Sequence, residues 1–412
     1  MPDGTPELRL TLASSIKEVA AADWDACANG VEGASGNPFL SHAFLSALEE
    51  SGSATPETGW GPRHVLAHDD AGRLVGAVPL YVKGHSYGEY VFDWGWAEAF
   101  ERAGGHYYPK LLAGVPFTPV TGPRLLMRAD AATPALRATL ARGLAEVTRQ
   151  LGVSSLHVNF CLKDEWEALG EAGFLKREGQ QYHWYNRGYK NFDDFLATLS
   201  SRKRKNIRKE REAVASSGLI VETLTGDDLK PRHWDAFFDF YEDTAGRKWG
   251  QAYLTREFFD LLGERLADSV VLVMAFNGKR PIAGALNLYG GGVIYGRNWG
   301  ALEHHPFLHF EACYYRAIDF AIERGLARVE AGAGGRHKIA RGYLPAPTLS
   351  AHWIKEANFR DAVARFLMAE RSQVARERMI LTERGPFRKD GGQDANETSA
   401  DTAPAHPDEE DF

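Results

Sequence analysis

Gly76-Ala77-Val78-Pro79-Leu80-Tyr81 is repeated later in the chain as Gly284-Ala285-Leu286-Asn287-Leu288-Tyr289. Upstream of these stretches, Trp24-Asp25-Ala26 is repeated as Trp234-Asp235-Ala236. Three further pairs follow the same order: Phe39-Leu40-Ser41 with Tyr253-Leu254-Thr255, Gly173-Phe174-Leu175 with Gly342-Tyr343-Leu344, and His183-Trp184 with His352-Trp353. Self-similarity that keeps one order through both halves indicates an internal duplication.

Each copy predicts the same order of elements. A helix at the Trp-Asp-Ala triplet precedes a second helix, for which Ser41 or Thr255 is the expected N-cap. A hairpin follows at 65–81 and at 270–289, and a third strand is expected through Trp94-Gly95 and Trp299-Gly300. The next helices are expected at 136–151 and, with Pro306 as a first helical position, at 306–324. Strands follow, the last around each His-Trp pair, so the pattern predicts an α/β (α+β) domain present twice, with mixed sheets flanked by helices.

The duplication predicts a first domain at 8–187 and a second at 188–370. Residues 371–412 are expected to be a helix end and an acidic tail, disordered from about Gly385. The first copy is about 35 residues longer between its hairpin and its next helix, because of an insertion at 84–123 rich in glycine, proline and aromatic residues. So long an excursion forms either a wall of a substrate cleft or packing between domains.

Composition places the chain among ordinary globular proteins. Its 412 residues are 44% hydrophobic and 25% charged, which is enough for two cores. The net charge of −7 comes from eight acidic residues in the tail from Asp390, which contains no Lys or Arg. Three scattered cysteines, the lack of a signal-like start and the lack of an 18-residue apolar run predict a cytoplasmic protein that does not span a membrane.

The second copy contains a stretch suited to binding anions. Glu330-Ala331 is followed by the glycine-rich turn 332–335 and by the basic helix 336–341. Backbone N–H groups of such a turn, together with a helix N-terminus, attract anions, although a solvated basic turn is an equally open interpretation. In the first copy, Glu165, Glu167 and Glu171 stand where the second has Gly334, Arg336 and Ala340, so the charge is inverted on a shared scaffold.

Three longer stretches resemble the FemAB-like family, also called peptidoglycan biosynthesis/recognition proteins, of the GNAT acyltransferase superfamily. They are Asn37-Pro38-Phe39-Leu40-Ser41, the segment from Tyr107-Tyr108-Pro109-Lys110 to Pro116-Phe117-Thr118-Pro119-Val120, and the segment from His309-Phe310-Glu311 to Arg341-Gly342-Tyr343. The resemblance covers 37–366 and implies two tandem GNAT-like domains that transfer an acyl or aminoacyl group to an amine. The better-known Fem transferases take amino acids from charged tRNA and attach them to peptidoglycan precursors.

The expected donor is aminoacyl-tRNA or acyl-CoA, and no other cofactor is predicted. A GNAT domain that binds coenzyme A typically presents [QR]-x-x-G-x-[GA] straight after a strand, where amides cradle the pyrophosphate. The segment 297–302 begins this way but departs from the pattern at Leu302, and Glu303-His304-His305-Pro306 postpones the helix. Asp93-Trp94-Gly95-Trp96 in the first copy lacks the leading Arg or Gln as well. These departures favour an aminoacyl-tRNA donor.

Transfer to an amine requires a group that accepts a proton and groups that stabilise an oxyanion. The predicted catalytic residues are His337, Glu330 and Glu311, and Tyr314 is either an acid or part of the core. The predicted substrate-binding residues are Lys338, Arg341, Arg336, Arg297, Trp299, Tyr107, Tyr108 and Lys110. His304, His305 and His309 keep no regular spacing with acidic or cysteine ligands, so no metal site is predicted.

The connector between the copies, 191–217, is expected to be helical and strongly basic. Seven of the ten residues from Arg202 to Arg211 are Lys or Arg. They either follow the phosphates of a nucleic acid or form a solvated helix face. The candidate contacts are Arg202, Lys203, Arg204, Lys205 and Arg208.

Three functions follow from these observations. The first is an acyl- or aminoacyltransferase of Fem type that acts on a small-molecule or peptide amine, with possible tRNA binding and with its active cleft in the second copy. The second is an acyl-CoA-dependent N-acyltransferase. The third is a non-catalytic protein that binds RNA or a cell-wall precursor.

Overall fold

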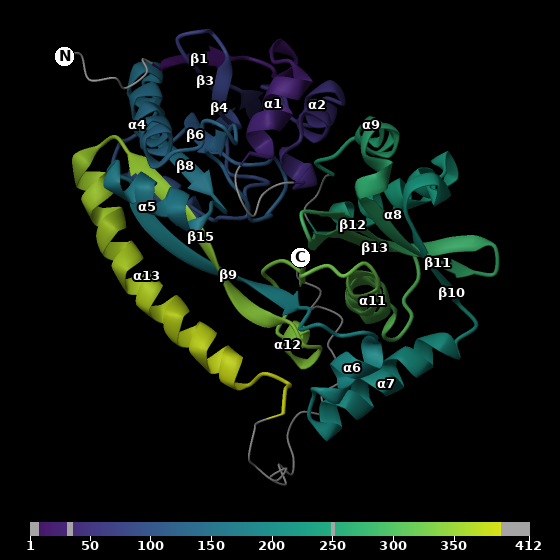
Figure 1. Ribbon diagram of the computed structural model, residues 1–412. Helices are drawn as coiled ribbons and strands as arrows, with labels where there is room; N and C mark the ends of the chain where they lie inside the picture. The colour runs from purple at the N-terminus through teal and green to yellow at the C-terminus, as the bar shows by residue number, and fades with distance from the viewer. Residues whose placement is uncertain (1–7, 31–35, 249–251, 389–412) are drawn as a thin grey trace. The chain divides into compact units, whose positions relative to one another are not determined.

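The computed structural model describes residues 8–30, 36–248 and 252–388. Contacts divide the chain into two compact units, each treated by itself (Figure 1). Unit 1 comprises Met1–Gly179, Tyr253–Ala267 and Pro347–Val374, and unit 2 comprises Gln180–Ala252, Asp268–Ala346 and Ala375–Phe412. The predicted acidic tail lies almost entirely outside the described residues.

Unit 1 contains a sheet of order β1-β3-β4-β7 and a second set of strands of order β15-β8-β6-β5-β2. Its strands are β1 (Arg9–Ala13), β2 (Trp60–Pro62), β3 (His64–His68), β4 (Leu74–Val78), β5 (Leu80–Lys83), β6 (Lys110–Ala113), β7 (Leu126–Met127), β8 (Ser155–Asn159) and the second part of β15 (Leu344–Ile354). Its helices are α1 (Ala21–Ala28), α2 (His42–Glu50), α3 (Trp94–Arg102), α4 (Pro134–Leu151), α5 (Lys163–Glu171), α9 (Arg256–Leu266) and the first part of α13 (Ala357–Glu383).

Unit 2 contains strands in the order β10-β11-β12-β13-β14-β9. They are the second part of β9 (Leu175–Tyr185), β10 (Ile220–Leu224), β11 (Val270–Asn277), β12 (Arg280–Gly290), β13 (Val293–Ala301) and β14 (Arg328–Glu330). The helices are α6 (Phe192–Ala197), α7 (Ser201–Ala215), α8 (Pro231–Lys248), α10 (Leu308–Phe310), the π-helix η5 (Glu311–Tyr315), α11 (Arg316–Glu323), α12 (His337–Ala340) and the end of α13.

Each unit takes its last strand from the other copy of the repeat. β9 follows the first copy, yet residues 183–185 pair with β14 in unit 2. β15 follows the second copy, yet residues 350–354 pair with β8 in unit 1. Both strands carry a His-Trp pair at the corresponding place. Each strand therefore has the sequence pattern of the strand whose position it takes. The units therefore do not follow the chain in simple order.

The predicted caps of the repeated helices are confirmed. The Ser41 hydroxyl accepts a hydrogen bond from the Phe44 N–H, and Thr255 accepts the equivalent bond from Phe258, both at 3.2 Å. The two helices, α2 and α9, pack together within unit 1, where the rings of Phe44 and Phe258 meet edge to face with centroids 5.7 Å apart. Corresponding faces of the repeat thus bury each other's aromatic residues.

The predicted third strand of the first copy is wrong. Trp94-Gly95 begins helix α3, which buries Trp96 and Ala97 on one face. The strand that runs parallel to β8 is β6, inside the predicted insertion 84–123, and all four of its residues are buried. A short run buried on both faces is typical of parallel strands, whereas spaced aromatic residues on an otherwise polar segment favour a helix.

The repeated stretch 76–81 and 284–289 folds differently in its two copies. In unit 1 the ladder stops at Val78, and β5 resumes at Leu80, because Pro79 lacks an N–H group for pairing. In unit 2 the strand continues through Asn287, but its register with β13 shifts between Ala285 and Asn287. The Asn287 amide donates to the carbonyl oxygen of Val271 at 3.1 Å. A strand break in one copy is therefore a β-bulge in the other.

Apolar residues at helical spacing close the core of unit 1. In α4, Leu136, Leu140 and Leu144 are buried against β4, β6 and β8, and each contributes roughly 1.5–3 kcal/mol by leaving water. Thr133 caps the helix, and Gly152, in the left-handed region at φ 71°, ends it as predicted.

Candidate functional site

A pocket in unit 2 opens where β13 and β14 separate. The two strands run parallel and are paired up to Tyr295 and Glu330, beyond which they part. The pocket is lined by Ala285, Leu286, Asn287, Gly296, Arg297, Asn298, Trp299, Cys313, Tyr314 and Ala331. The bulge of β12 at 285–287 therefore forms one wall. Of the predicted substrate-binding residues, Arg297 and Trp299 line it.

The helical segment after β13 supplies Cys313 and Tyr314 to the pocket. The predicted start of this helix at Pro306 is wrong, because Phe307 takes a left-handed conformation at φ 64° and the helix begins at Leu308. The segment then widens into a π-helix, a rare conformation that is frequently found at functional sites. The side chain of Tyr314 is buried, and its hydroxyl lies 3.0 Å from Nε2 of His337.

His337 is held by the glycine turn that precedes it. Gly335 has a φ of 85°, and a Cβ atom at this position would lie 2.4 Å from Cε1 of the His337 ring. Only glycine allows this approach without a shift of the ring. The ring also packs against Phe310, with centroids 5.4 Å apart. The sequence predicts the turn and the basic residues, and the structure adds Tyr314 as the partner of His337.

The imidazole of His337 is neutral at physiological pH. Burial lowers its pKa to about 3, and the charges of Arg341 and Lys338 act in the same direction. A neutral ring has one donor and one acceptor nitrogen, so it either accepts a hydrogen bond from the Tyr314 hydroxyl or donates one to it. The pair can therefore exchange a proton without carrying a net charge at rest.

The other basic residues of this segment have different environments. Lys338 is fully buried, and its Nζ donates to the carbonyl oxygen of Ala331 at 2.5 Å. Arg341 is also buried, forms an ion pair with Glu210 at 2.9 Å and donates to the carbonyl oxygen of His337. Arg336 is exposed and lies 3.7 Å from Glu377.

The two predicted carboxylate bases do not line the pocket. Glu330 points to the sheet face opposite Val329 and Ala331, which pack in one core with Tyr314. It accepts a hydrogen bond from Arg328 at 2.9 Å. The Glu311 carboxylate is buried and receives hydrogen bonds from Arg211 and Arg316.

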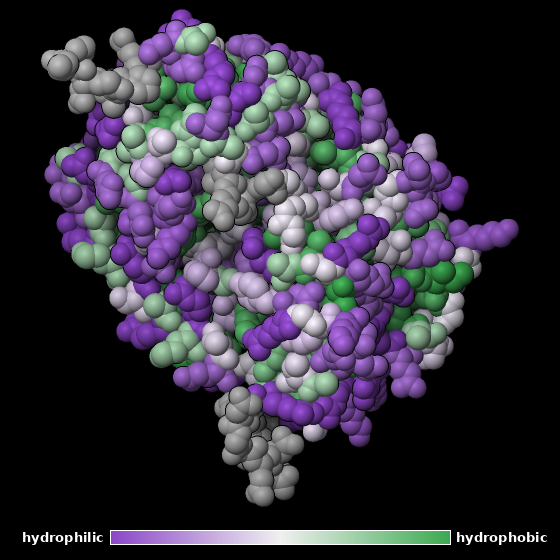
Figure 2. All heavy atoms as spheres, viewed as in Figure 1, coloured by the Kyte–Doolittle hydropathy of each residue, from purple (hydrophilic) through white to green (hydrophobic). Residues whose placement is uncertain are grey.

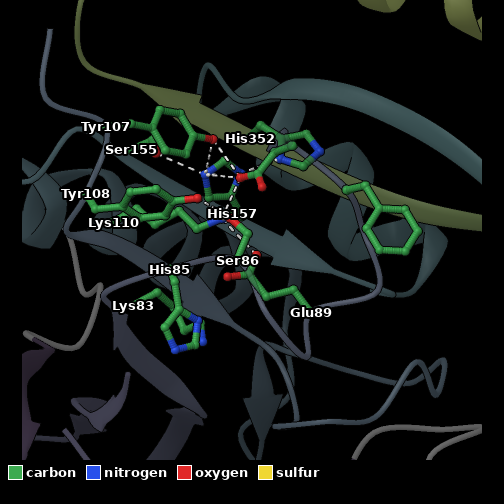
Figure 3. Close-up of polar contacts among 12 residues, drawn as sticks. Lys83, His85, Ser86, Glu89, Tyr107, Tyr108, Lys110, Ser155, His157 and His352 are labelled. Atoms are coloured by element: carbon green, nitrogen blue, oxygen red, sulfur yellow. Dashed lines mark hydrogen bonds and ion pairs between the residues drawn. The ribbon is translucent and has the colours of Figure 1, made fainter. Parts of the chain in front are cut away.

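Tyr107, Tyr108 and Lys110 belong to a buried polar network in unit 1 (Figure 3). The Lys110 ammonium forms ion pairs with Glu89, at 2.8 Å, and with Asp93, and it donates to Ser86 at 2.8 Å. Although burial opposes its charge, the two carboxylates raise the pKa of Lys110. The Tyr107 hydroxyl donates to Asp93 at 2.6 Å, and the half-buried Tyr108 contacts Ser86.

Two histidines extend this network. Nδ1 of His157 lies 2.7 Å from Nδ1 of His352, and Nε2 of His157 lies 2.9 Å from the hydroxyl of Ser155 (Figure 3). Burial lowers the pKa of His157 to about 3. The sequence pattern does not predict Glu89, Asp93 or either histidine, because the segment 89–93 and the two histidines are far apart from one another in the chain. Within unit 1, the predicted substrate-binding residues Tyr107, Tyr108 and Lys110 thus form hydrogen bonds with other side chains of the protein.

The basic connector is helix α7. Ile207 and Val214 are buried, whereas Arg202, Lys205 and Arg208 are exposed and Lys203 and Arg204 are partly exposed. Figure 2 shows mostly hydrophilic residues over this helix. Arg208 forms an ion pair with Asp193 at 2.7 Å. One face of α7 therefore packs in the unit while the other carries positive charge into solvent.

Two kinds of feature are absent from the part of the chain that the structure describes. Within 8–30, 36–248 and 252–388, no group of three or more His, Cys, Asp or Glu side chains is arranged to hold a metal ion. Across the same ranges, every helix is too short or too polar to cross a membrane.

Two GNAT-like halves, one of them with a pocket where its parallel strands part, define a tandem GNAT-type fold. The chain belongs to the FemAB-like family of peptidoglycan biosynthesis/recognition, whose model matches residues 15–389. Family membership supports an acyl or aminoacyl transferase in general. No curated protein matches the chain by sequence.

Solved structures share the fold at low sequence identity. FemX has a TM-score of 0.53 and 13% identity, with 85% of this chain and 98% of FemX covered. The C-terminal domain of a putative lysylphosphatidylglycerol synthetase from Agrobacterium fabrum has a TM-score of 0.52 and 10% identity, with 84% and 96% covered. At such identities, the similarity concerns the fold alone.

Proposed function

We propose that the protein transfers an aminoacyl group from aminoacyl-tRNA to a primary amine, in the pocket between β13 and β14. The observation that carries this proposal is the pair formed by the Tyr314 hydroxyl and His337 Nε2, 3.0 Å apart, with Tyr314 on the pocket wall. Family membership supplies the class of reaction. The pair supplies the proton transfers that the reaction needs.

The segment after β13 favours an RNA ester over acyl-CoA as the donor. β13 ends at Ala301, and the next helix begins only at Leu308, so no helix N-terminus directly follows the strand. Carboxylates occupy this region instead: Glu303, which pairs with Arg280 and His305, and the buried Glu311. A pyrophosphate needs free backbone amides at a helix N-terminus, and no helix N-terminus lies straight after β13 to supply them.

The reaction is a displacement at the ester carbonyl. The neutral amine attacks the carbonyl carbon, the new C–N bond forms, and the ester C–O bond breaks to release the terminal ribose hydroxyl. The amine loses one proton, and the leaving oxygen gains one. In our proposal, the Tyr314 hydroxyl gives its proton to the leaving oxygen, while His337 passes the proton of the amine back to Tyr314. Because the His337 pKa is about 3, this relay is concerted and no charged imidazolium accumulates.

Three further residues complete the proposed site. Arg297 and Asn298 on the pocket wall hold anionic or carbonyl groups of the substrates. The buried ammonium of Lys338, fixed on the carbonyl of Ala331, places positive potential near the Tyr314–His337 pair and favours the oxyanion that develops during attack. The exposed basic face of α7 contacts the phosphates of the RNA.

The decisive experiment offers labelled aminoacyl-tRNA and labelled acyl-CoA separately to the wild type, to His337→Ala and to His304→Ala. His304 is an exposed histidine that shortly precedes helix α10, so it serves as the matched control. We expect the wild type and the control to consume aminoacyl-tRNA in the presence of amines, and His337→Ala to be at least about 100-fold slower. Consumption of acyl-CoA alone would instead establish the N-acyltransferase, and binding of RNA without turnover would establish a binding protein.

A further inference from the structure

The Tyr314–His337 pair joins two separate elements of unit 2. Tyr314 lies in the π-helix η5, and His337 begins the single turn of α12, 23 residues further along the chain. The single turn of α12 is too short to hold its own position, whereas η5 is part of the continuous helical segment 308–323. The 3.0 Å separation of the hydroxyl and the imidazole therefore depends on whatever fixes both elements.

Two consecutive residues of α7 contact both elements. The Glu210 carboxylate accepts hydrogen bonds from the Arg341 guanidinium at 2.9 and 3.2 Å, and from the hydroxyl of Tyr315. The Arg211 guanidinium donates to Glu311 at 3.1 and 3.2 Å. Tyr315 and Glu311 belong to η5, whereas Arg341 follows α12 directly.

Arg341 transmits the contact with Glu210 to the site. Its guanidinium donates to the carbonyl oxygen of His337 at 2.9 Å and stacks over the ring of Phe310 at 3.3 Å. Phe310 in turn packs against His337. Both side chains of the ion pair are largely buried, with 8% of Arg341 and 15% of Glu210 exposed. A buried two-point ion pair of this kind fixes geometry more strongly than an exposed one.

We infer that Glu210 is a positioning residue, which acts through Arg341 to hold His337 against Tyr314, and that Arg211 holds the opposite side of the pair through Glu311. The importance of this role for catalysis rests on the proposed function, but the geometry does not. Helix α7 is thus more than a carrier of surface charge: its inner face sets the arrangement of the site.

The test compares Glu210→Gln with Glu212→Gln, which removes an exposed carboxylate from the same helix. Ring nitrogens are observed by NMR in protein labelled with ¹⁵N-histidine, and the His337 signals are assigned by their loss in His337→Gln. In Tyr314→Phe the hydrogen bond is absent, which gives the reference shift. We expect Glu210→Gln to move the Nε2 resonance of His337 toward this reference and Glu212→Gln to leave it unchanged. An unchanged resonance in a folded Glu210→Gln variant would overturn the inference.

Three further measurements complete the test. If Glu210→Gln does not fold, Glu210→Asp, which keeps the charge but shortens the reach, is measured in its place with the same two outcomes. If the wild type transfers aminoacyl groups, Glu210→Gln should lower kcat by about 10- to 100-fold with KM changed by less than about threefold, as expected for a misplaced catalytic pair. Combining it with Arg341→Met should cost no more than Arg341→Met alone. A wild type without transfer activity would sink the proposed function, while the resonance would still decide the positioning role.

Discussion

Both units contain two parallel strands that part, yet the ends of these strands differ. In unit 1, β6 and β8 are paired up to Ala113 and Val158, and beyond them the Arg124 guanidinium is buried and donates to the carbonyl oxygens of Asn159 and Val120. In unit 2, the equivalent ends of β13 and β14 border a pocket. The same arrangement of strands is thus closed by the chain itself in one unit and open in the other.

The acidic counterpart of the basic turn explains the closure. The Glu165 carboxylate accepts hydrogen bonds from the backbone N–H groups of Arg124, Leu125 and Leu162, at 2.6 to 3.0 Å. It fills the place that an external anion would take at such amides. Its counterpart in unit 2 is Gly334, which has no side chain to do so. The charge inversion between the copies therefore separates a unit in which an acidic side chain covers its own backbone amides from one in which the corresponding residue has no side chain.

The largest expected effect tests whether the network of unit 1 is structural. Lys110→Met leaves Glu89 and Asp93 buried without their cation, so we expect the free energy of unfolding to fall by about 3–5 kcal/mol. Denaturant titration measures this change. Activity per folded molecule should stay within about twofold of the wild type, and a loss of activity in the folded fraction would assign chemistry to unit 1 and break the comparison.

In unit 2 the expected loss is kinetic. Tyr314→Phe removes only a hydroxyl, and we expect kcat for aminoacyl transfer to fall by about 100-fold, or about 2.7 kcal/mol of activation free energy. The melting temperature should change little. Tyr108→Phe in unit 1, which removes a half-buried hydroxyl that contacts Ser86, is the matched control and should keep full activity.

Lys83 provides a test of unit 1 that depends on pH. This lysine stands directly across from Lys110 in the ladder of β5 and β6, and its Nζ lies 3.5 Å from the centre of the Trp60 ring. Burial lowers its pKa to about 6. Between pH 6 and 10.5 the unfolded chain therefore binds more protons than the folded one at this site, so this residue makes stability rise with pH in that window.

Replacing Lys83 by Met should remove that rise. We expect the variant to be more stable than the wild type at pH 7, with the difference shrinking by at most about 1.4 kcal/mol per pH unit toward pH 10. Unfolding free energies measured at several pH values between about 6 and 9 check this. The exposed Lys163→Met should leave the slope unchanged, and an equal slope in Lys83→Met would show that Lys83 stays charged in the folded protein.

Local patterns predicted much of the fold, and long-range pairing explains what they missed. The duplication, the caps Ser41 and Thr255 and the hairpin strands followed from short spacings, because caps and hairpins depend on neighbours in the chain. The exchange of β9 and β15 did not, since two strands with the same His-Trp pattern fit either place. The site was predicted in part: the turn at 332–335 and His337 stood out, whereas the widening into a π-helix, which turns Tyr314 to the pocket, has no signature in the spacing of apolar residues.

The smallest expected effect concerns the surface of unit 2. Lys205→Gln removes one exposed charge of α7, so binding of tRNA should weaken by a few fold and to a similar degree for every tRNA sequence. The plot of log binding constant against log salt should lose about one unit of slope, because one fewer counterion is released. Arg142→Gln, on the exposed face of α4 in unit 1, removes the same charge from the other unit and should leave both quantities unchanged. Equal losses from the two variants would mean that the RNA is held by general surface charge, and the contrast between the units would then be limited to the ends of their strands.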